Sequence, residues 1–173
     1  MQAPELVNVA WRALNGTQRT FTVGNDRARR YAHGFAPIAA VADPSRPDFE
    51  SLRFLAVPGE RLYIAGLSTD GDLPGWKRVD LTQVVQMVGP VDPHAPPAAA
   101  YEVRLLGPEH LDEMAELVAN ARPGPWGPRS MELGSYVGVF AQGRLLSMAG
   151  TRMASGPWVE ISAVCTLPRA SGQ

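Results

Sequence analysis

The residues best suited to chemistry lie near the end of the chain. An apolar, β-branched run from Val159 to Leu167 predicts a strand that carries one acid, Glu160, and one thiol, Cys165. A small-residue turn with Ser171 and Gly172 follows it. Many proteins hold a phosphate or pyrophosphate on the backbone N–H groups of a glycine-containing turn after a strand. The pattern therefore predicts a strand with one acid that leads into an anion-binding turn.

Glu160 is the candidate general base, because it is the only ionisable carboxyl group in this apolar strand. Burial there would raise its pKa toward neutrality. The alternative is that Glu160 faces solvent near the start of the strand, or pairs with an arginine such as Arg152. The sequence leaves both interpretations open. Cys165 has no histidine near it in the sequence, and we interpret it as a small apolar core residue.

The second half of the chain has a clear pattern of strands and one helix. Alternating and helical periodicities predict a strand, a helix and three antiparallel strands, over residues 101–106, 108–120, 135–141, 144–153 and 159–167. Gln142 and Gly143 predict a tight hairpin turn between the second and third strands. Three prolines between the helix and the second strand predict a rigid loop in which Trp126 is the only large side chain.

The first half mixes shorter elements. Its patterns predict helices over residues 3–14 and 49–56, strands over 35–41 and 61–66, and a strand-like, then mixed apolar segment over 76–88. We therefore expect a small α/β lobe over residues 1–88, a proline-rich linker over 89–100 and a second domain over 101–173. The size and mixed composition of the first lobe allow it to be a degenerate copy of the second.

Four segments of the second half carry a family resemblance: the run from Arg122 to Gly134, Tyr136-Val-Gly-Val, Gly143-Arg-Leu-Leu-Ser-Met-Ala-Gly150 and Glu160-Ile-Ser-Ala-Val-Cys-Thr166. With them, residues 105–173 resemble the first half of a GNAT-superfamily N-acetyltransferase domain. Residues 8–14 and 28–31 resemble the leader lobe of one bacterial branch. The resemblance implies an α/β fold with a mixed α+β sheet, of the acyl-CoA N-acyltransferase type.

This resemblance also implies a transferase reaction and a role for each candidate residue. Acetyl-CoA would give its acetyl group to an amine of a small molecule or peptide, by direct attack and without a metal. The implied cofactor contacts are backbone groups of the final strand and turn, and the general base is Glu160. Trp126 and Tyr136 would line the acceptor pocket, although both could instead pack where the two lobes meet. The cofactor contacts are Ala163, Val164, Cys165, Thr166, Ser171 and Gly172.

The family's pyrophosphate signature begins with Gln or Arg, whereas the matching position here is Ser171. The later small residues of that signature, and the helix after them, would lie past Gln173. We therefore expect a form truncated within the acetyl-CoA motif, with little or no activity of its own. Its final strand would be an exposed apolar edge that favours self-association. The alternative is a non-catalytic binding or regulatory module derived from a GNAT enzyme.

Composition restricts the remaining choices. The chain has 173 residues, a net charge of −1 and one cysteine. The near-neutral charge gives no reason to expect nucleic acid or an anionic membrane as a partner, and the cluster Arg27-Ala-Arg-Arg30 is interpreted as a solvated turn or helix face. A single cysteine excludes an intrachain disulfide and fits a reducing cytoplasm. The start of the chain lacks a signal-peptide pattern, so we expect a cytoplasmic protein.

Overall fold

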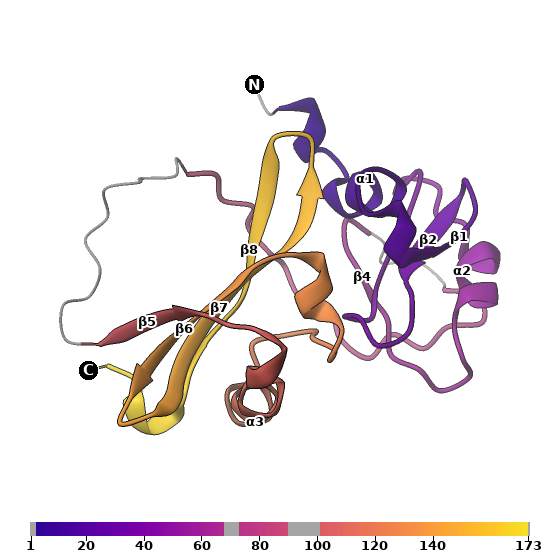
Figure 1. Ribbon diagram of the computed structural model, residues 1–173. Coiled ribbons are helices and arrows are strands. Elements are labelled where there is room, and N and C mark those ends of the chain that lie inside the picture. The colour runs from indigo at the N-terminus through magenta and orange to yellow at the C-terminus, as the bar shows by residue number, and fades with distance from the viewer. Residues whose placement is uncertain (1–2, 68–72, 90–100, 173) are drawn as a thin grey trace.

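The computed structural model describes residues 3–67, 73–89 and 101–172. It contains two four-stranded sheets, one in each half of the chain, which lie side by side (Figure 1). The first half comprises η1 (Pro4–Leu6), α1 (Val9–Asn15), η2 (Arg19–Phe21), β1 (Thr22–Gly24), β2 (Ala28–Tyr31), β3 (Ile38–Val41), α2 (Phe49–Leu55) and β4 (Tyr63–Ile64). The second half comprises β5 (Glu102–Leu105), η3 (Pro108–His110), α3 (Leu111–Ala121), η4 (Ser130–Leu133), β6 (Tyr136–Ala141), β7 (Arg144–Ser155), β8 (Trp158–Thr166) and η5 (Pro168–Ala170). The α/β class expected from the sequence is confirmed.

The first sheet has a helix on each face. Its strands lie in the order β1-β2-β3-β4, antiparallel except for the parallel pair β3 and β4. Leu14 of α1 packs with Tyr31 and Ile38, and Leu52 of α2 packs with Ala39 on the opposite face. Every residue of β2 and β3 is buried. Burial on both faces explains why these strands lack the apolar–polar alternation that makes a strand visible in a sequence.

This burial corrects one expectation. The arginines of the basic cluster were interpreted as solvated, but Arg29 is 6% exposed and Arg30 is 2% exposed, both within β2. Arg30 forms a two-pronged ion pair with Glu60 at 2.5 Å, and Arg29 donates to the side chain of Asn15 at 3.0 Å. Buried guanidinium groups need such partners. Arg27 is solvated as expected, with a side chain 72% exposed, whereas Arg29 and Arg30 belong to an internal polar network.

Other boundaries in the first half also differ from the prediction. The helix expected over residues 3–14 is split, because Asn8 adopts a left-handed conformation with φ 50° between η1 and α1. Residues 73–89 contain no helix or strand, and several of their apolar side chains are exposed, Val85 and Met87 by 86% and 88%. Of the predicted linker over 89–100, only Gly89 lies within the described residues.

The second sheet is antiparallel throughout, in the order β5-β6-β7-β8, with α3 against one face. Met114 and Leu117 of α3 pack against Phe140, Met148 and other side chains of the sheet. The expected order of strand, helix and three strands is present. The predicted hairpin turn is also present, with positive φ at both central residues, Gln142 and Gly143.

The two halves meet where the β7–β8 hairpin extends beyond its own sheet toward α1 (Figure 1). Met153 of β7 belongs to the core cluster of the first half, beside Ala10 and Tyr31. β8 is the last strand of its sheet, and Val159, Ile161 and Val164 are exposed along it. The predicted self-association through this strand stays a prediction. Within the described residues, no helix is long and apolar enough to cross a membrane.

Candidate functional site

The final strand, β8, contains a bulge at the residues predicted to contact acetyl-CoA. Met148 pairs with Cys165 and Gly150 pairs with Ser162, so two residues, Ala163 and Val164, lie opposite Ala149 alone. Ala163 has φ 52°, in the left-handed region that glycine prefers. A non-glycine residue in this region costs of order 1–3 kcal/mol. The surrounding structure must therefore hold the bulge in place.

A second irregularity lies nearer the first half of the molecule. Thr151 pairs with Ile161 and Ala154 pairs with Val159, which places Arg152 and Met153 of β7 opposite Glu160 of β8. The extra residue on β7 lets the two neighbouring side chains serve different purposes. Met153 packs into the core of the first half, while Arg152 reaches the acid on the facing strand.

Arg152 and Glu160 form a bidentate ion pair. The Arg152 Nε donates to Glu160 Oε2 at 3.0 Å and Nη2 donates to Oε1 at 2.7 Å. Nη1 of the same guanidinium donates to the Pro125 carbonyl at 2.9 Å. The side chains of Arg152 and Glu160 are 11% and 30% exposed, so water screens the pair only in part. This is the pairing with Arg152 considered from the sequence; the role of Glu160 as a base remains a prediction.

The predicted acceptor residues lie around this ion pair. Trp126 follows Pro125, and its indole Nε1 is buried without a hydrogen bond of good geometry. Tyr136 is 2% exposed, and its ring packs so closely on Gly150 that a Cβ there would overlap it. Burial raises the pKa of Tyr136, and the positive charge of Arg152 partly opposes that effect. The fold thus brings Trp126, Tyr136 and Glu160, which are distant in sequence, to one place.

Gln18 reaches the same region from the first half, although no sequence pattern marked it as a site residue. It is 5% exposed and lies between α1 and η2. Its side chain binds the backbone of β7 on both sides of Met153, at the Arg152 carbonyl and the Ala154 N–H. A lone glutamine in a polar turn carries no signal that separates it from a solvated residue, so only the structure could identify it.

The remaining predicted cofactor residues follow the bulge. Cys165 is 7% exposed, and burial raises the pKa of its thiol, which agrees with a core residue. The hydroxyl of Thr166 lies 2.9 Å from that of Ser147 on β7. Ser171 and Gly172 are exposed after η5. Among the described residues, no group of three His, Cys, Asp or Glu side chains could hold a metal ion.

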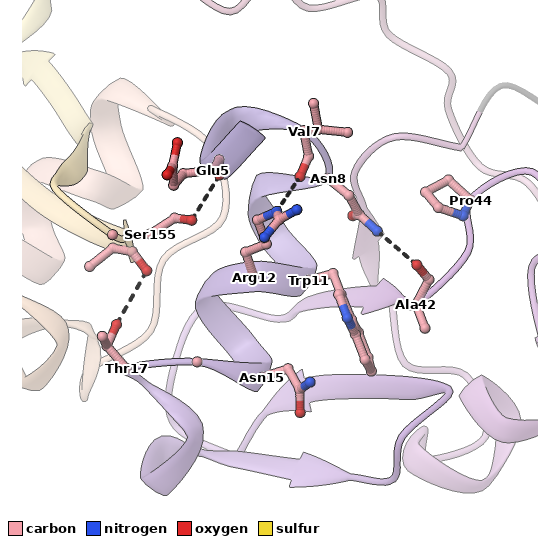
Figure 2. Close-up of a pocket in the computed structure, with 13 residues that line it drawn as sticks. Glu5, Val7, Asn8, Trp11, Arg12, Asn15, Thr17, Ala42, Pro44 and Ser155 are labelled. Atoms are coloured by element: carbon pink, nitrogen blue, oxygen red, sulfur yellow. Dashed lines mark hydrogen bonds between the residues drawn. The ribbon is translucent and has the colours of Figure 1, made fainter. Parts of the chain in front are cut away.

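A cavity of about 630 Å³ lies elsewhere, between the start of α1 and the β7–β8 turn. Figure 2 shows Trp11, Asn8 and Arg12 on its helical side and Ser155 across from them. Asn8 and Arg12 are held by hydrogen bonds to backbone carbonyls. None of the residues predicted for acetyl transfer lines this cavity. The candidate site is therefore the junction of Arg152, Glu160 and the β8 bulge.

The arrangement is similar to that of a solved structure from Novosphingobium aromaticivorans DSM 12444, a protein assigned to the GNAT family as an acetyltransferase. The TM-score is 0.79 with 27% sequence identity, over 99% of this chain and 75% of that chain. No family model matches the sequence, and no curated protein matches it. The fold and the structural likeness together support a GNAT-superfamily acetyltransferase.

Proposed function

We propose that the chain transfers the acetyl group of acetyl-CoA to an amine by direct attack. The observation that carries the proposal is the bulge at Ala163 and Val164, on a strand at the edge of a GNAT-type sheet. A bulge bends its strand and interrupts the regular ladder. Among the described residues, the outer edge of β8 has no neighbouring strand. Its backbone groups can therefore pair with an extended ligand.

The pantetheine arm is such a ligand, because its amide groups can pair with a strand edge as a peptide would. We assign this contact to the backbone of residues 163–166. The exposed Ser171 and Gly172 remain the proposed pyrophosphate contacts further along the chain. The thioester would then lie toward the other end of β8, where Glu160 is. Adenine and pyrophosphate would point away from the first half of the molecule.

Glu160 is the proposed base for the amine. It lies three residues before the bulge, roughly 10 Å along the strand at about 3.3 Å per residue. An amine between Glu160 and the bulge would attack the thioester carbonyl, forming the C–N bond, and its proton would pass to the Glu160 carboxylate. The C–S bond would then break, and the CoA thiolate would leave and take up that proton, so that the carboxylate is regenerated. Both carboxylate oxygens accept hydrogen bonds from Arg152. The amine or a water must therefore share or displace one of those bonds.

The acceptor would approach along the loop that contains Trp126. The indole N–H of Trp126 makes no hydrogen bond of good geometry and interacts only loosely with the Tyr136 hydroxyl, so we assign it as a donor to a polar group of the acceptor. We propose that Tyr136, which is buried, supports this region from the sheet rather than lying open to solvent. The acceptor class is a small primary amine or a peptide amine. We further propose that the reaction takes place in the cytoplasm, which the single free cysteine supports.

The first test is the binding of acetyl-CoA to the purified chain by calorimetry, with CoA as competitor. We expect a dissociation constant in the micromolar range and displacement by CoA. A thiol-reactive dye then measures CoA release with small amines, amino acids and peptides as acceptors. The absence of acetyl-CoA binding by a folded sample would reject the proposed function.

One observation favours a second function, a non-catalytic binding module. Arg152 occupies both oxygens of the only acid in the final strand, so the free protein presents no unbonded carboxylate oxygen there. A module of this kind would bind acetyl-CoA without consuming it. Binding in the calorimeter with no CoA release for any amine would favour this second function.

A further inference from the structure

The side chain of Gln18 makes the full set of hydrogen bonds available to a carboxamide. Its Nε2 donates to the carbonyls of Arg152 at 2.6 Å and Leu133 at 3.2 Å. Its Oε1 accepts from the Tyr31 hydroxyl at 2.7 Å and from the Ala154 N–H at 3.3 Å. A carboxamide has two N–H donors and two acceptor lone pairs, so each is used. A buried amide bonded in this way has one allowed position.

These hydrogen bonds contact β7 beyond the last residue that pairs with β6. The ladder between β6 and β7 ends at the pair Tyr136 and Gly150, followed by one backbone bond from the Thr151 N–H to the Ser135 carbonyl and by bonds between the Thr151 hydroxyl and the Ser135 backbone. Beyond that point, Gln18 binds backbone groups of Arg152 and Ala154. The carboxamide resembles a peptide group, so it can take the place of a strand neighbour. It therefore fixes the backbone on both sides of the extra residue in the β7 bulge.

The position of the β7 backbone determines where the Arg152 side chain points. Arg152 must reach the Glu160 carboxylate on one side and the Pro125 carbonyl in the Trp126 loop on the other. A two-pronged arginine–carboxylate pair tolerates little rotation. A small rotation of the backbone at Arg152 would therefore break the geometry of the pair.

We propose that Gln18 is a positioning residue, which holds the β7 bulge so that Arg152 keeps Glu160 and the Trp126 loop in place. The first half of the chain thereby contributes to the site in the second half. The catalytic consequence rests on the proposed function, whereas the positioning itself does not. Gln18 would act only through Arg152, without touching either substrate.

The test is a two-dimensional NMR measurement of the Arg152 Nε–H group, assigned by its disappearance in Arg152→Lys. In the Gln18→Met variant, which keeps side-chain length but makes no hydrogen bonds, this resonance should move toward that of an exposed arginine such as Arg122. Its exchange with water should become about tenfold faster, the factor that corresponds to about 1.4 kcal/mol of lost hydrogen bonding.

Thr17→Ala is the matched control. Thr17 precedes Gln18 and also bonds to β7, at the Ala154 carbonyl, but it has no bond to Arg152. We expect the Arg152 resonance to stay unchanged in this variant. If Gln18→Met does not fold, Gln18→Asn replaces it, because an amide one methylene shorter cannot span the same four partners. An unchanged Arg152 resonance in either folded Gln18 variant would overturn the proposal.

The kinetics of acetyl transfer provide a separate test of the positioning role of Gln18. If the wild-type chain transfers acetyl groups, Gln18→Met should lower kcat at least tenfold and change the KM for acetyl-CoA less than twofold, since the β8 bulge is untouched. A changed KM with unchanged kcat would also overturn the proposal. A wild-type chain without transfer activity would count against the proposed function, and the Arg152 resonance would still decide the positioning role.

Discussion

The β7–β8 hairpin contains two bulges that are maintained in different ways. The bulge in β7 is surrounded by polar side chains: Arg152 binds Glu160 across the strands, and Gln18 binds the backbone from the other half of the molecule. The bulge in β8 depends on an unusual backbone conformation, with Ala163 at φ 52° and only 8% exposed. The first depends on specific side chains, whereas the second depends on close packing around a small residue.

The two bulges of this hairpin are therefore suited to different roles, one in ligand binding and one in positioning an acid. A bulge formed by the backbone alone can present N–H and C=O groups to a ligand without competition from side chains. A bulge held by an ion pair can keep an acid at a fixed position. Substitutions at the two bulges should therefore have separable effects, on cofactor binding at one and on turnover at the other.

The largest effect is expected at Ala163. A β-branched side chain is strained at positive φ and has no space in the core, so Ala163→Val should lower the free energy of unfolding by about 2–4 kcal/mol. It should also abolish acetyl-CoA binding. Ala163→Gly is the matched control, because relief of strain and loss of a buried methyl group should leave stability within about 1 kcal/mol of wild type. Urea unfolding and calorimetry measure both; equal effects of the two variants would refute a strained bulge.

A smaller loss of stability is expected at the ion pair. Arg152→Met removes three hydrogen bonds and leaves the Glu160 carboxylate without its charged partner, which should cost about 1–3 kcal/mol. Glu160→Gln keeps the shape of the acid and should cost less. Acetyl-CoA should still bind to both variants, while Glu160→Gln should lose transfer activity. Retained activity in Glu160→Gln would remove Glu160 from the mechanism.

The Arg30–Glu60 pair offers a comparison within the first half of the chain. Hydrogen bonds from Arg30, partly opposed by burial, lower the pKa of Glu60 below its ordinary value of 4.5. The carboxylate therefore stabilises the fold above the unfolded-state pKa, and this stability is lost as the pH falls through the lower folded-state pKa. Glu60→Gln should cost about 1–2 kcal/mol at pH 7, and the difference from wild type should shrink below pH 4.5. A pH-independent difference in urea midpoints would contradict this linkage.

Sequence reasoning was most successful where local chemistry decides local structure. Gln142 and Gly143 form the expected turn with positive φ at both positions; Gly143 adopts it without strain, whereas the short connection between the strands imposes it on Gln142. The helix expected over 108–120 is present as η3 and α3, with Met114 and Leu117 on its buried face. The family resemblance, read from short segments of the second half, is confirmed by the structural comparison.

Prediction was weakest where burial on two faces removes the usual pattern. β2 was missed because its arginines were assumed to face water, yet Arg30 is buried and paired with Glu60. Residues 76–88 have an apolar composition typical of a strand, but the described part of the chain gives them no neighbouring strand. In both cases the outcome depended on partners that are distant in sequence.

The sequence by itself determined two features of this region. Apolar periodicity predicted the strand that carries Glu160, and turn chemistry predicted the hairpin before it. Only the tertiary structure decided that Arg152 rather than solvent meets Glu160, and that Gln18 joins them from about 130 residues away. The physical reason is that a buried polar group must find a partner of the right geometry. Which partner is within reach depends on how the two halves of the chain pack.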